Sequence, residues 1–255
     1  MTTPLEGMKA LVTGVANDSS IAWGCARAFR EAGADIALTY LNDKARPHVE
    51  PLAENISAPL FMPLDVTDDT QMDAVFTEIR RRWGRLDILL HSVAYCPRDD
   101  LLGRVVDSSR SGFASAMDVS VHSFIRMARR AAALMPGGGC MLTVSYLGAT
   151  RVIDNYNLMG PVKAALEAVV RELASELGPS GIRVNALSPG PMPTRAAAGI
   201  GHFDELMHQA ASRAPTGRLT SLEEVGAYAA FLASPGAANV TGTTPFIDGG
   251  VHIMG

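Results

Sequence analysis

The sequence predicts an α/β protein in which one parallel sheet carries helices on both faces. Short apolar segments alternate with longer helical patterns along most of the chain, and this alternation indicates successive βαβ units. Crossovers between parallel strands are right-handed, so the units form a doubly wound sheet of the Rossmann type. No linker or internal repeat divides residues 1–255, and 47% of them are apolar. We therefore expect one domain with a sizeable core.

The first half of the chain predicts four strands and three helices. The strands are short buried runs, and the first of them ends at the dipeptide Thr13-Gly14. The first helical pattern ends before Gly33, a residue suited to a helix C-cap. The second is polar, and Pro47 and Pro51 bound or distort its early part. In chain order the expected elements are strand 9–12, helix 21–32, strand 35–40, helix 43–55, strand 60–64, helix 69–83 and strand 87–93.

The second half continues the alternation with longer helices. A helix over 113–135 is closed by Pro136 and three glycines, and a strand follows at 140–145. A helix over 157–177 and a strand over 183–187 complete the pattern. Between these elements lie two unusually long loops.

The two long loops cover residues 95–111 and 188–203. Loops of this length inside a compact domain are usually functional. Both leave the carboxyl ends of predicted strands, which is where open α/β sheets bind ligands. We therefore expect the two loops to meet over a ligand site.

Charge and composition exclude several classes of protein. The net charge is -4 and the pI is near 5.9, which gives no basic footprint for nucleic acid or an anionic membrane. Cys25, Cys96 and Cys140 stand far apart, so we expect reduced thiols and no metal site. The chain shows neither a signal-peptide pattern nor an apolar run long enough for a membrane span. These features favour a soluble, cytoplasmic protein.

The stretch over 145–163 holds the most reactive side chains. Tyr156 and Lys163 are seven residues apart, close to two turns if both lie on one helix, or roughly 10 Å along its axis. A lysine cation near a phenol favours the ionised phenol and so eases proton transfer at neutral pH. The alternative is that Tyr146 and Tyr156 pack in the core while the lysine is solvated.

The segment over 13–24 is a candidate phosphate-binding turn. Gly14 supplies a tight turn, and Ala16, Ser19 and Ser20 are small enough for a pyrophosphate to approach the backbone at a helix N-terminus. The segment is not G-x-G-x-x-G, so an ordinary strand-to-helix turn is the alternative. Its place as the first turn of a doubly wound sheet favours the phosphate site.

Two further strand ends bear on the cofactor. Tyr40, Leu41 and Asn42 offer neither an acid for a ribose nor an arginine for a 2′-phosphate, which favours NADH, although Lys44 or Arg46 leaves NADPH open. Asp65 either borders the adenine or caps a helix. His91 is expected to be packed, and the small residues that follow it allow a nucleotide to lie flat.

With these motifs in place, the whole chain resembles a short-chain dehydrogenase/reductase, and more narrowly the bacterial enoyl-acyl-carrier-protein reductases of the NADH type. Ordinary short-chain reductases place a tyrosine four residues before the lysine, where this chain has Met159; the enoyl reductases share its longer spacing. The motifs are G-x5-S-I-A at 14–22, S-Y-L-G at 145–148, Tyr-x6-Lys at 156–163, R-V-N-A-L-S-P-G-P at 183–191, Thr194 and F-I-D-G-G at 246–250.

The resemblance implies an enzyme of fatty-acid synthesis that reduces a trans-2-enoyl thioester, carried on acyl carrier protein or coenzyme A. Tyr156 would stabilise the enolate oxygen and supply a proton, Lys163 would hold the nicotinamide ribose, and Tyr146 would have a secondary role. Substrate contacts are expected from Tyr95, Tyr146, Tyr156 and Met159, with a substrate-binding loop around 190–205. Cofactor contacts are expected from Gly14, Ala16, Ser20, Ile21, Leu41, Asp65, Val66, Ser92, Val93, Lys163, Met192 and Thr194.

The resemblance also implies a homotetramer, with which the apolar face of residues 113–135 is compatible. Leu41, Tyr95 and Arg195 depart from residues common in the family, so the cofactor and the acyl chain length stay open. Two other functions are kept as hypotheses: a carbonyl reductase of the 3-ketoacyl type, and an NAD-binding paralogue with altered chemistry.

Overall fold

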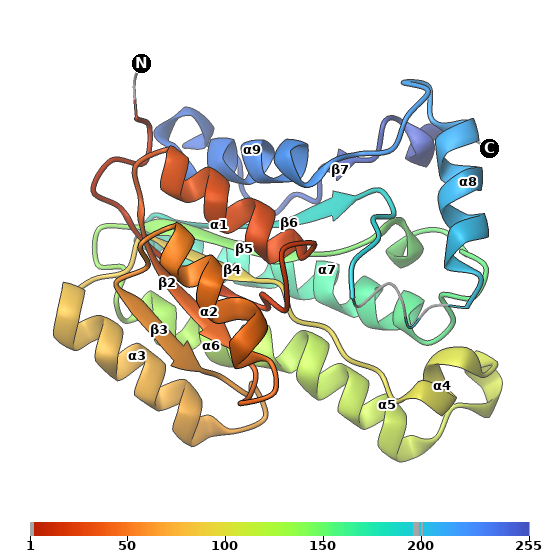
Figure 1. The fold of residues 1–255 in the computed structure, drawn as a ribbon, viewed down its shortest axis with the longest axis horizontal. Helices are drawn as coiled ribbons and strands as arrows, with labels where there is room; N and C mark the ends of the chain where they lie inside the picture. The colour runs from red at the N-terminus through yellow and green to blue at the C-terminus, as the bar shows by residue number, and fades with distance from the viewer. Residues whose placement is uncertain (1–2, 196–198, 200, 255) are drawn as a thin grey trace.

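A parallel sheet of seven strands forms the centre of the fold (Figure 1). The computed structural model describes residues 3–195, 199 and 201–254, and the seven strands are counted among these residues. The strand order is β3-β2-β1-β4-β5-β6-β7. Successive strands are added on one side of β1 up to β3 and on its other side from β4 onward. The strands are β1 (Lys9–Thr13), β2 (Asp35–Tyr40), β3 (Leu60–Pro63), β4 (Ile88–His91), β5 (Gly139–Val144), β6 (Ile182–Pro189) and β7 (Phe246–Ile247).

Alternating side chains of the strands enter two separate cores. In β1 the side chain of Leu11 joins one core, while Ala10 and Val12 join the other. β4 repeats the pattern, with Leu89 on the first side and Ile88 on the second. A sheet buried on both faces needs strands that are apolar throughout, which is why these strands read as continuous apolar runs.

Helices cover both faces of this sheet. One core takes its helical side chains from α3, α5, α6 and α7, and the other from α1, α2 and α9. Figure 1 shows α1 and α9 together on one face and α3, α6 and α7 on the other. The helices are α1 (Ile21–Glu31), α2 (Arg46–Asn55), α3 (Asp69–Trp83), α4 (Arg98–Leu102), α5 (Arg110–Met117), α6 (Ser123–Ala132), α7 (Met159–Leu177), α8 (Phe203–Arg213) and α9 (Leu222–Ala233).

The predicted doubly wound fold is confirmed, with differences in the helices. The helix expected over 113–135 starts earlier, at Arg110, because Ser109 caps it by accepting a hydrogen bond from the N–H of Gly112. A π-helical turn, Asp118–His122, then separates α5 from α6. The loop expected over 95–111 contains α4, and α8 and α9 were not predicted at all.

α1 and α9 cross at a pair of glycines. A Cβ added at Gly226 would lie 2.4 Å from the carbonyl oxygen of Gly24, and one added at Gly24 would lie 2.7 Å from the carbonyl oxygen of Leu222. The two backbones therefore touch without side chains between them. This contact fixes α9 beside the helix that begins at the candidate phosphate turn.

None of the described helices combines the length and the apolar character needed to cross a bilayer.

Candidate active site

A cavity of about 690 Å³ opens at the carboxyl ends of the strands. Its walls come from the start of α1, the loop after β4, the end of β5, the start of α7 and the segment after β6. The predicted residues that line it are Ile21, Ser92, Val93, Tyr95, Tyr146, Tyr156, Met159, Lys163, Met192 and Thr194. The other predicted residues, Gly14, Ala16, Ser20, Leu41, Asp65 and Val66, lie outside this lining.

Tyr156 and Lys163 both face this cavity, but they do not share a helix. α7 begins at Met159, and Tyr156 lies in the turn before it. Asn155 and Asn157 have φ values of 62° and 44°, in the left-handed region, so the backbone around Tyr156 cannot continue a right-handed helix. The condition that both residues lie on one helix is therefore not met, although both side chains line the same cavity.

Lys163 is a buried cation held at the end of β5. Its Nζ atom donates a hydrogen bond to the carbonyl oxygen of Val144 at 2.6 Å, and the residue is 6% exposed. Burial lowers the pKa of Lys163 to about 8, and the Glu167 carboxylate opposes that shift. At neutral pH the ammonium is therefore charged, but it is a much stronger acid than an exposed lysine.

The phenol of Tyr156 is buried, and its ring meets that of Tyr146 edge to face at 4.8 Å between centroids. Burial and the nearby Tyr146 raise the pKa of Tyr156 well above its usual range. The expectation that Lys163 would favour the ionised phenol is therefore wrong, because desolvation dominates. The pKa of Tyr146 is also raised, to about 12, mainly by burial. Both phenols are neutral hydrogen-bond donors.

A second buried charge, which the sequence did not reveal, lies one turn beyond Lys163. Glu167 is 7% exposed, and its Oε1 atom accepts a hydrogen bond from Ser145 Oγ at 2.6 Å. Burial raises the pKa of this carboxyl. Ser145 directly precedes Tyr146, so this bond fixes the strand end that carries the tyrosine. The only signal for Glu167 in the sequence is its i,i+4 spacing from Lys163.

The turn after β1 is built by its own small polar side chains. Ser20 Oγ accepts hydrogen bonds from the backbone N–H groups of Ala16 and Asn17, at 3.0 and 3.1 Å. Gly14 has φ 94°, and a Cβ there would lie 1.9 Å from the carbonyl oxygen of Ser92. Only glycine therefore allows β1 to approach the end of β4 so closely. Ile21 then starts α1, where the N–H groups of Trp23 and Gly24 bond to the carbonyl oxygen of Ser20 and those of Ile21 and Ala22 come before this first helical bond.

The end of β2 leaves an apolar side chain at the surface. Leu41 is 53% exposed. Arg46, the nearby candidate for a 2′-phosphate, pairs with Glu50 at 2.8 Å and lies over the Tyr40 ring at 5.9 Å. Because its guanidinium already has these partners, Arg46 is poorly placed to favour NADPH.

The segment after β3 resolves one of the open alternatives. Asp65 does not cap α3, because Asp68 accepts the capping bonds from the N–H groups of Thr70 and Gln71. Asp65 instead accepts bonds from Thr67 in a local turn, and Val66 is buried in the core.

His91 is confirmed as a packed residue. It is fully buried, and its ring nitrogens lie 3.1 Å from Thr143 Oγ1 and 2.8 Å from Ser123 Oγ. Burial, and secondarily the Lys163 cation, lower its pKa to about 3, so the ring is neutral.

The described residues contain no cluster of side chains arranged to hold a metal ion.

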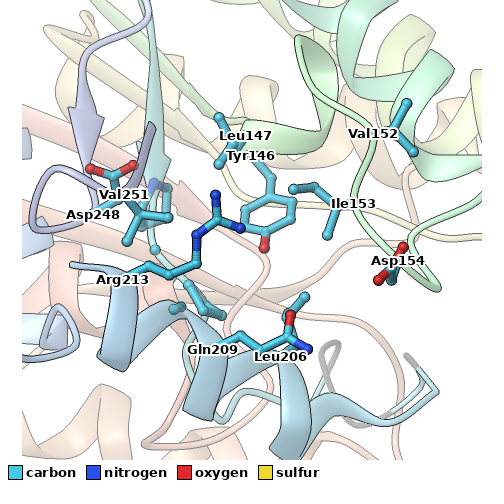
Figure 2. Close-up of a pocket in the computed structure, with 14 residues that line it drawn as sticks. Tyr146, Leu147, Val152, Ile153, Asp154, Leu206, Gln209, Arg213, Asp248 and Val251 are labelled. Carbon is cyan, nitrogen blue, oxygen red and sulfur yellow. The ribbon is translucent and has the colours of Figure 1, made fainter. Parts of the chain in front are cut away.

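A smaller cavity of about 120 Å³ lies behind Tyr146, whose side chain borders both spaces. Figure 2 shows Arg213 reaching from α8 toward Tyr146, with Gln209 on the same helix. The Asp248 carboxylate borders this space and accepts from His252 Nδ1 at 2.9 Å. Sequence reasoning missed this polar side cavity because α8 was not predicted.

The outer wall of the main cavity forms where α4 meets the segment after β6. A Cβ at Gly199 would lie 3.5 Å from Leu101 Cδ2, and one at Gly201 would lie 3.8 Å from Leu102 Cδ2. Asn157 Nδ2 donates to the carbonyl oxygen of Leu101 at 2.8 Å, which ties α4 to the turn that carries Tyr156. The two long loops therefore meet over the site. Residues 196–198 and 200 of the expected substrate-binding loop lie outside the described residues.

The fold and the site together define a nucleotide-binding α/β protein whose deep cavity presents two neutral phenols and a buried ammonium. Comparison with known proteins identifies the family within this class. The family model described as enoyl-(acyl carrier protein) reductase matches residues 14–252. The chain therefore belongs to the enoyl-(acyl carrier protein) reductase family.

Individual relatives match the chain along nearly all its length. It is 47% identical to the enoyl-[acyl-carrier-protein] reductase [NADH] 1 of Rhizobium meliloti, over 98% of this chain and 92% of that protein. Among solved structures, the Bacillus cereus enoyl-acyl carrier protein reductase with NADP+ and indole naphthyridinone is 44% identical, with a TM-score of 0.97 and full coverage of both chains. The Anaplasma phagocytophilum reductase in complex with NAD is 42% identical, with a TM-score of 0.96 over 100% of this chain and 97% of that one.

Proposed function

We propose that this chain is an NADH-dependent enoyl thioester reductase of fatty-acid synthesis, which reduces the double bond of a trans-2-enoyl group to give the saturated acyl thioester. The observation that carries the proposal is the cavity that holds Tyr156 and Lys163 together. Met159 occupies the place from which ordinary short-chain reductases present their tyrosine, and it is an apolar wall of the same cavity. The names of the relatives, NADH reductases of enoyl groups on acyl carrier protein, agree with this chemistry.

The residues present fit a nicotinamide dinucleotide. The cavity extends from Ile21, at the start of α1, past Ser92 to Lys163. The first N–H groups of α1 and the N-terminal end of its dipole suit a pyrophosphate. An ammonium has three N–H donors, of which Val144 takes one, so Lys163 has donors to offer ribose hydroxyls. When bound, NADH supplies the hydride that is added to the β-carbon.

The chain's own residues then manage charge and protons. Negative charge develops on the thioester oxygen as the β-carbon is reduced, and the Tyr156 hydroxyl is placed to donate a hydrogen bond to it. A buried donor stabilises such an oxyanion strongly because no water competes. The raised pKa of Tyr156 keeps its proton on the hydroxyl for that bond. Tyr156 then gives this proton to the α-carbon of the enolate and takes up another from solvent. The Lys163 cation adds positive charge beside the same cavity.

Several finer features form part of the proposal. The segment over 190–205 would act as the substrate-binding loop, and Phe203 and Leu206 at the start of α8 would contact the acyl chain. Acyl carrier protein is the proposed carrier and the cytoplasm the proposed compartment, both supported by the family. We also propose a homotetramer, which sedimentation would reveal as a species of about four times the 26.9 kDa chain.

The test is oxidation of NADH and NADPH with crotonyl and longer trans-2-enoyl thioesters, with a 3-ketoacyl thioester as the parallel substrate. We expect turnover of the enoyl substrates with NADH. Turnover of the keto substrate alone would instead establish a carbonyl reductase. Binding of NADH without turnover of either substrate would indicate a paralogue with altered chemistry.

A further inference from the structure

Two arginines from separate segments line the main cavity, and the expected chemistry uses neither. Arg98 is the first residue of α4, in the loop after β4, and Arg195 lies in the segment after β6. Both side chains belong to exposed residues, so they stand where the cavity meets solvent. The rest of the lining is dominated by apolar and aromatic side chains, apart from the tyrosines, Lys163 and small polar residues.

Two acidic residues of the adjoining helices α4 and α8 have partners other than these two cations. Asp100 is buried and accepts hydrogen bonds from the backbone N–H and the hydroxyl of Ser109. Glu205, in the first turn of α8, lies 3.2 Å from His202. Within the described part of the chain, no carboxylate lies within ion-pair distance of Arg98 or Arg195.

Other arginines of the chain contrast with this pair. Arg46 pairs with Glu50, Arg104 with Asp107, and Arg130 with Asp73. Among the described residues, the two guanidiniums at the cavity mouth therefore have no ion-pair partner that would compete with an anionic ligand. A guanidinium offers five N–H donors in a planar arrangement that matches the oxygens of a phosphate.

We propose that Arg98 and Arg195 form an anion-binding rim that holds the phosphate of the substrate's phosphopantetheine arm. This inference rests on the proposed function, because the thioester has to reach Tyr156 inside the cavity. The pantetheine portion next to the thioester is uncharged, so the first anion along the arm is the phosphate, which lies outside the cavity when the thioester is inside. Acyl carrier protein and coenzyme A both carry this group, and the rim recognises what they share.

The experiment compares two small substrates that differ only in the phosphate, crotonyl-4′-phosphopantetheine and crotonyl-pantetheine. They are assayed with the wild-type chain, Arg98→Gln, Arg195→Gln and the double variant. Each substitution should raise KM for the phosphorylated substrate by about 5- to 10-fold, as expected for a charge-assisted bond at a partly solvated rim. KM for crotonyl-pantetheine should stay within about 2-fold of wild type, since it lacks the charge that the arginines bind.

Arg104→Gln is the matched control. It removes an exposed arginine that is near α4 in the sequence but pairs with Asp107 and does not line the cavity. It should leave both KM values unchanged. NADH affinity, measured by fluorescence titration, should be unchanged in all variants.

Three results would overturn the rim. Equal increases in KM for both small substrates would show loss of cavity shape rather than of an anion site. Unchanged KM for the phosphorylated substrate would show that the arginines do not contact it. Weakened NADH binding would assign them to the cofactor. If the wild type turns over neither substrate but reduces a 3-ketoacyl thioester, the proposed function fails first, and the rim has no enoyl substrate to bind.

Crotonyl coenzyme A and crotonyl acyl carrier protein are the two sources of this phosphate, and both are assayed with the wild type and the double variant. The kcat/KM values of the wild type show which carrier it uses, and the double variant tests recognition of the phosphate that both share. Both carriers should lose affinity in the double variant, because both carry the phosphate. A loss confined to one of them would overturn recognition of the shared group.

Discussion

Tyr156 is the residue on which the proposed chemistry depends most directly. Its hydroxyl is a buried, neutral hydrogen-bond donor, and its ring packs against the ring of Tyr146 with 4.8 Å between the centroids. We expect Tyr156→Phe to lower kcat by about 10²- to 10³-fold, the cost of removing one donor to an oxyanion. NADH affinity should hardly change, because the ring and its packing remain. Stopped-flow turnover and NADH titration check this, and a parallel loss of cofactor affinity would contradict the oxyanion role.

Lys163 should set the alkaline limit of activity. Its pKa is lowered to about 8 by burial, so the ammonium is charged below that pH and loses its proton as the pH rises through it. The other groups that face it do not titrate there: His91 is neutral with a pKa of about 3, and the pKa of Tyr156 is raised above its usual range. NADH affinity and kcat/KM should therefore fall together above about pH 8.

A matched variant tests this assignment. Lys163→Arg keeps a cation whose pKa stays far above the pH range of the assay. The variant should be less active than the wild type, but its activity should not decrease as the pH rises through 8. Glu167 opposes the lowering of the Lys163 pKa, so Glu167→Gln should move the alkaline limb to lower pH. An unchanged limb in Lys163→Arg would assign it to another group.

At the scale of single residues the sequence indicated candidate side chains but not their surroundings. Tyr156 and Lys163 both line the cavity, although they do not share a helix. Their pKa shifts could not be predicted, since these depend on burial first, and then on Glu167 for Lys163 and on Tyr146 for Tyr156. The positive φ values of Asn155 and Asn157 were equally invisible, although asparagine tolerates that region better than most residues.

Among the elements, α1 and α9 depend on close backbone contact. Gly226→Ala places a Cβ 2.4 Å from the carbonyl oxygen of Gly24, and neither backbone can move without disturbing a helix. We expect it to destabilise the fold by about 1–3 kcal/mol, as overpacking does. Each kcal/mol should lower Tm by roughly 2–4 °C for a chain of this size.

Gly137→Ala is the control for that substitution. Gly137 is exposed, is not among the glycines with positive φ, and an added Cβ would meet no atom within 4 Å. At this position the change should be neutral or should stabilise the folded chain by about 0.4–1 kcal/mol, because alanine lowers the conformational entropy of the unfolded chain. Equal Tm values for the two variants would show that the helix crossing has room for a methyl group.

The strands were more predictable than the helices, for a physical reason. A strand buried on both faces is largely apolar, and the runs in β1, β2, β4 and β5 show this directly. α4 has five residues, too few for a periodic pattern, and α8 follows a segment rich in glycine and proline. The break between α5 and α6 brings Ser120 Oγ within 3.0 Å of the backbone N of Tyr95, a contact that no local pattern predicts.

For the whole molecule, cofactor binding should appear as added stability. A ligand that binds only the folded chain stabilises it by about 2.7 kcal/mol at 100 times its Kd, which at this size raises Tm by roughly 5–10 °C. We expect that shift with NADH and a much smaller one with NADPH at the same concentration. Leu41 offers no charge to a 2′-phosphate, and Arg46 is engaged by Glu50 and Tyr40.

Leu41→Arg tests the cause of that preference. The residue is 53% exposed at the end of β2, so an arginine fits there without disturbing the core. It should increase the NADPH-induced rise in Tm and leave the NADH-induced rise nearly unchanged, because only the 2′-phosphate gains a partner. An equal rise with both cofactors in the wild type would mean that the chain does not discriminate between them. If Leu41→Arg leaves the NADPH-induced rise unchanged, the discrimination comes from elsewhere in the cavity.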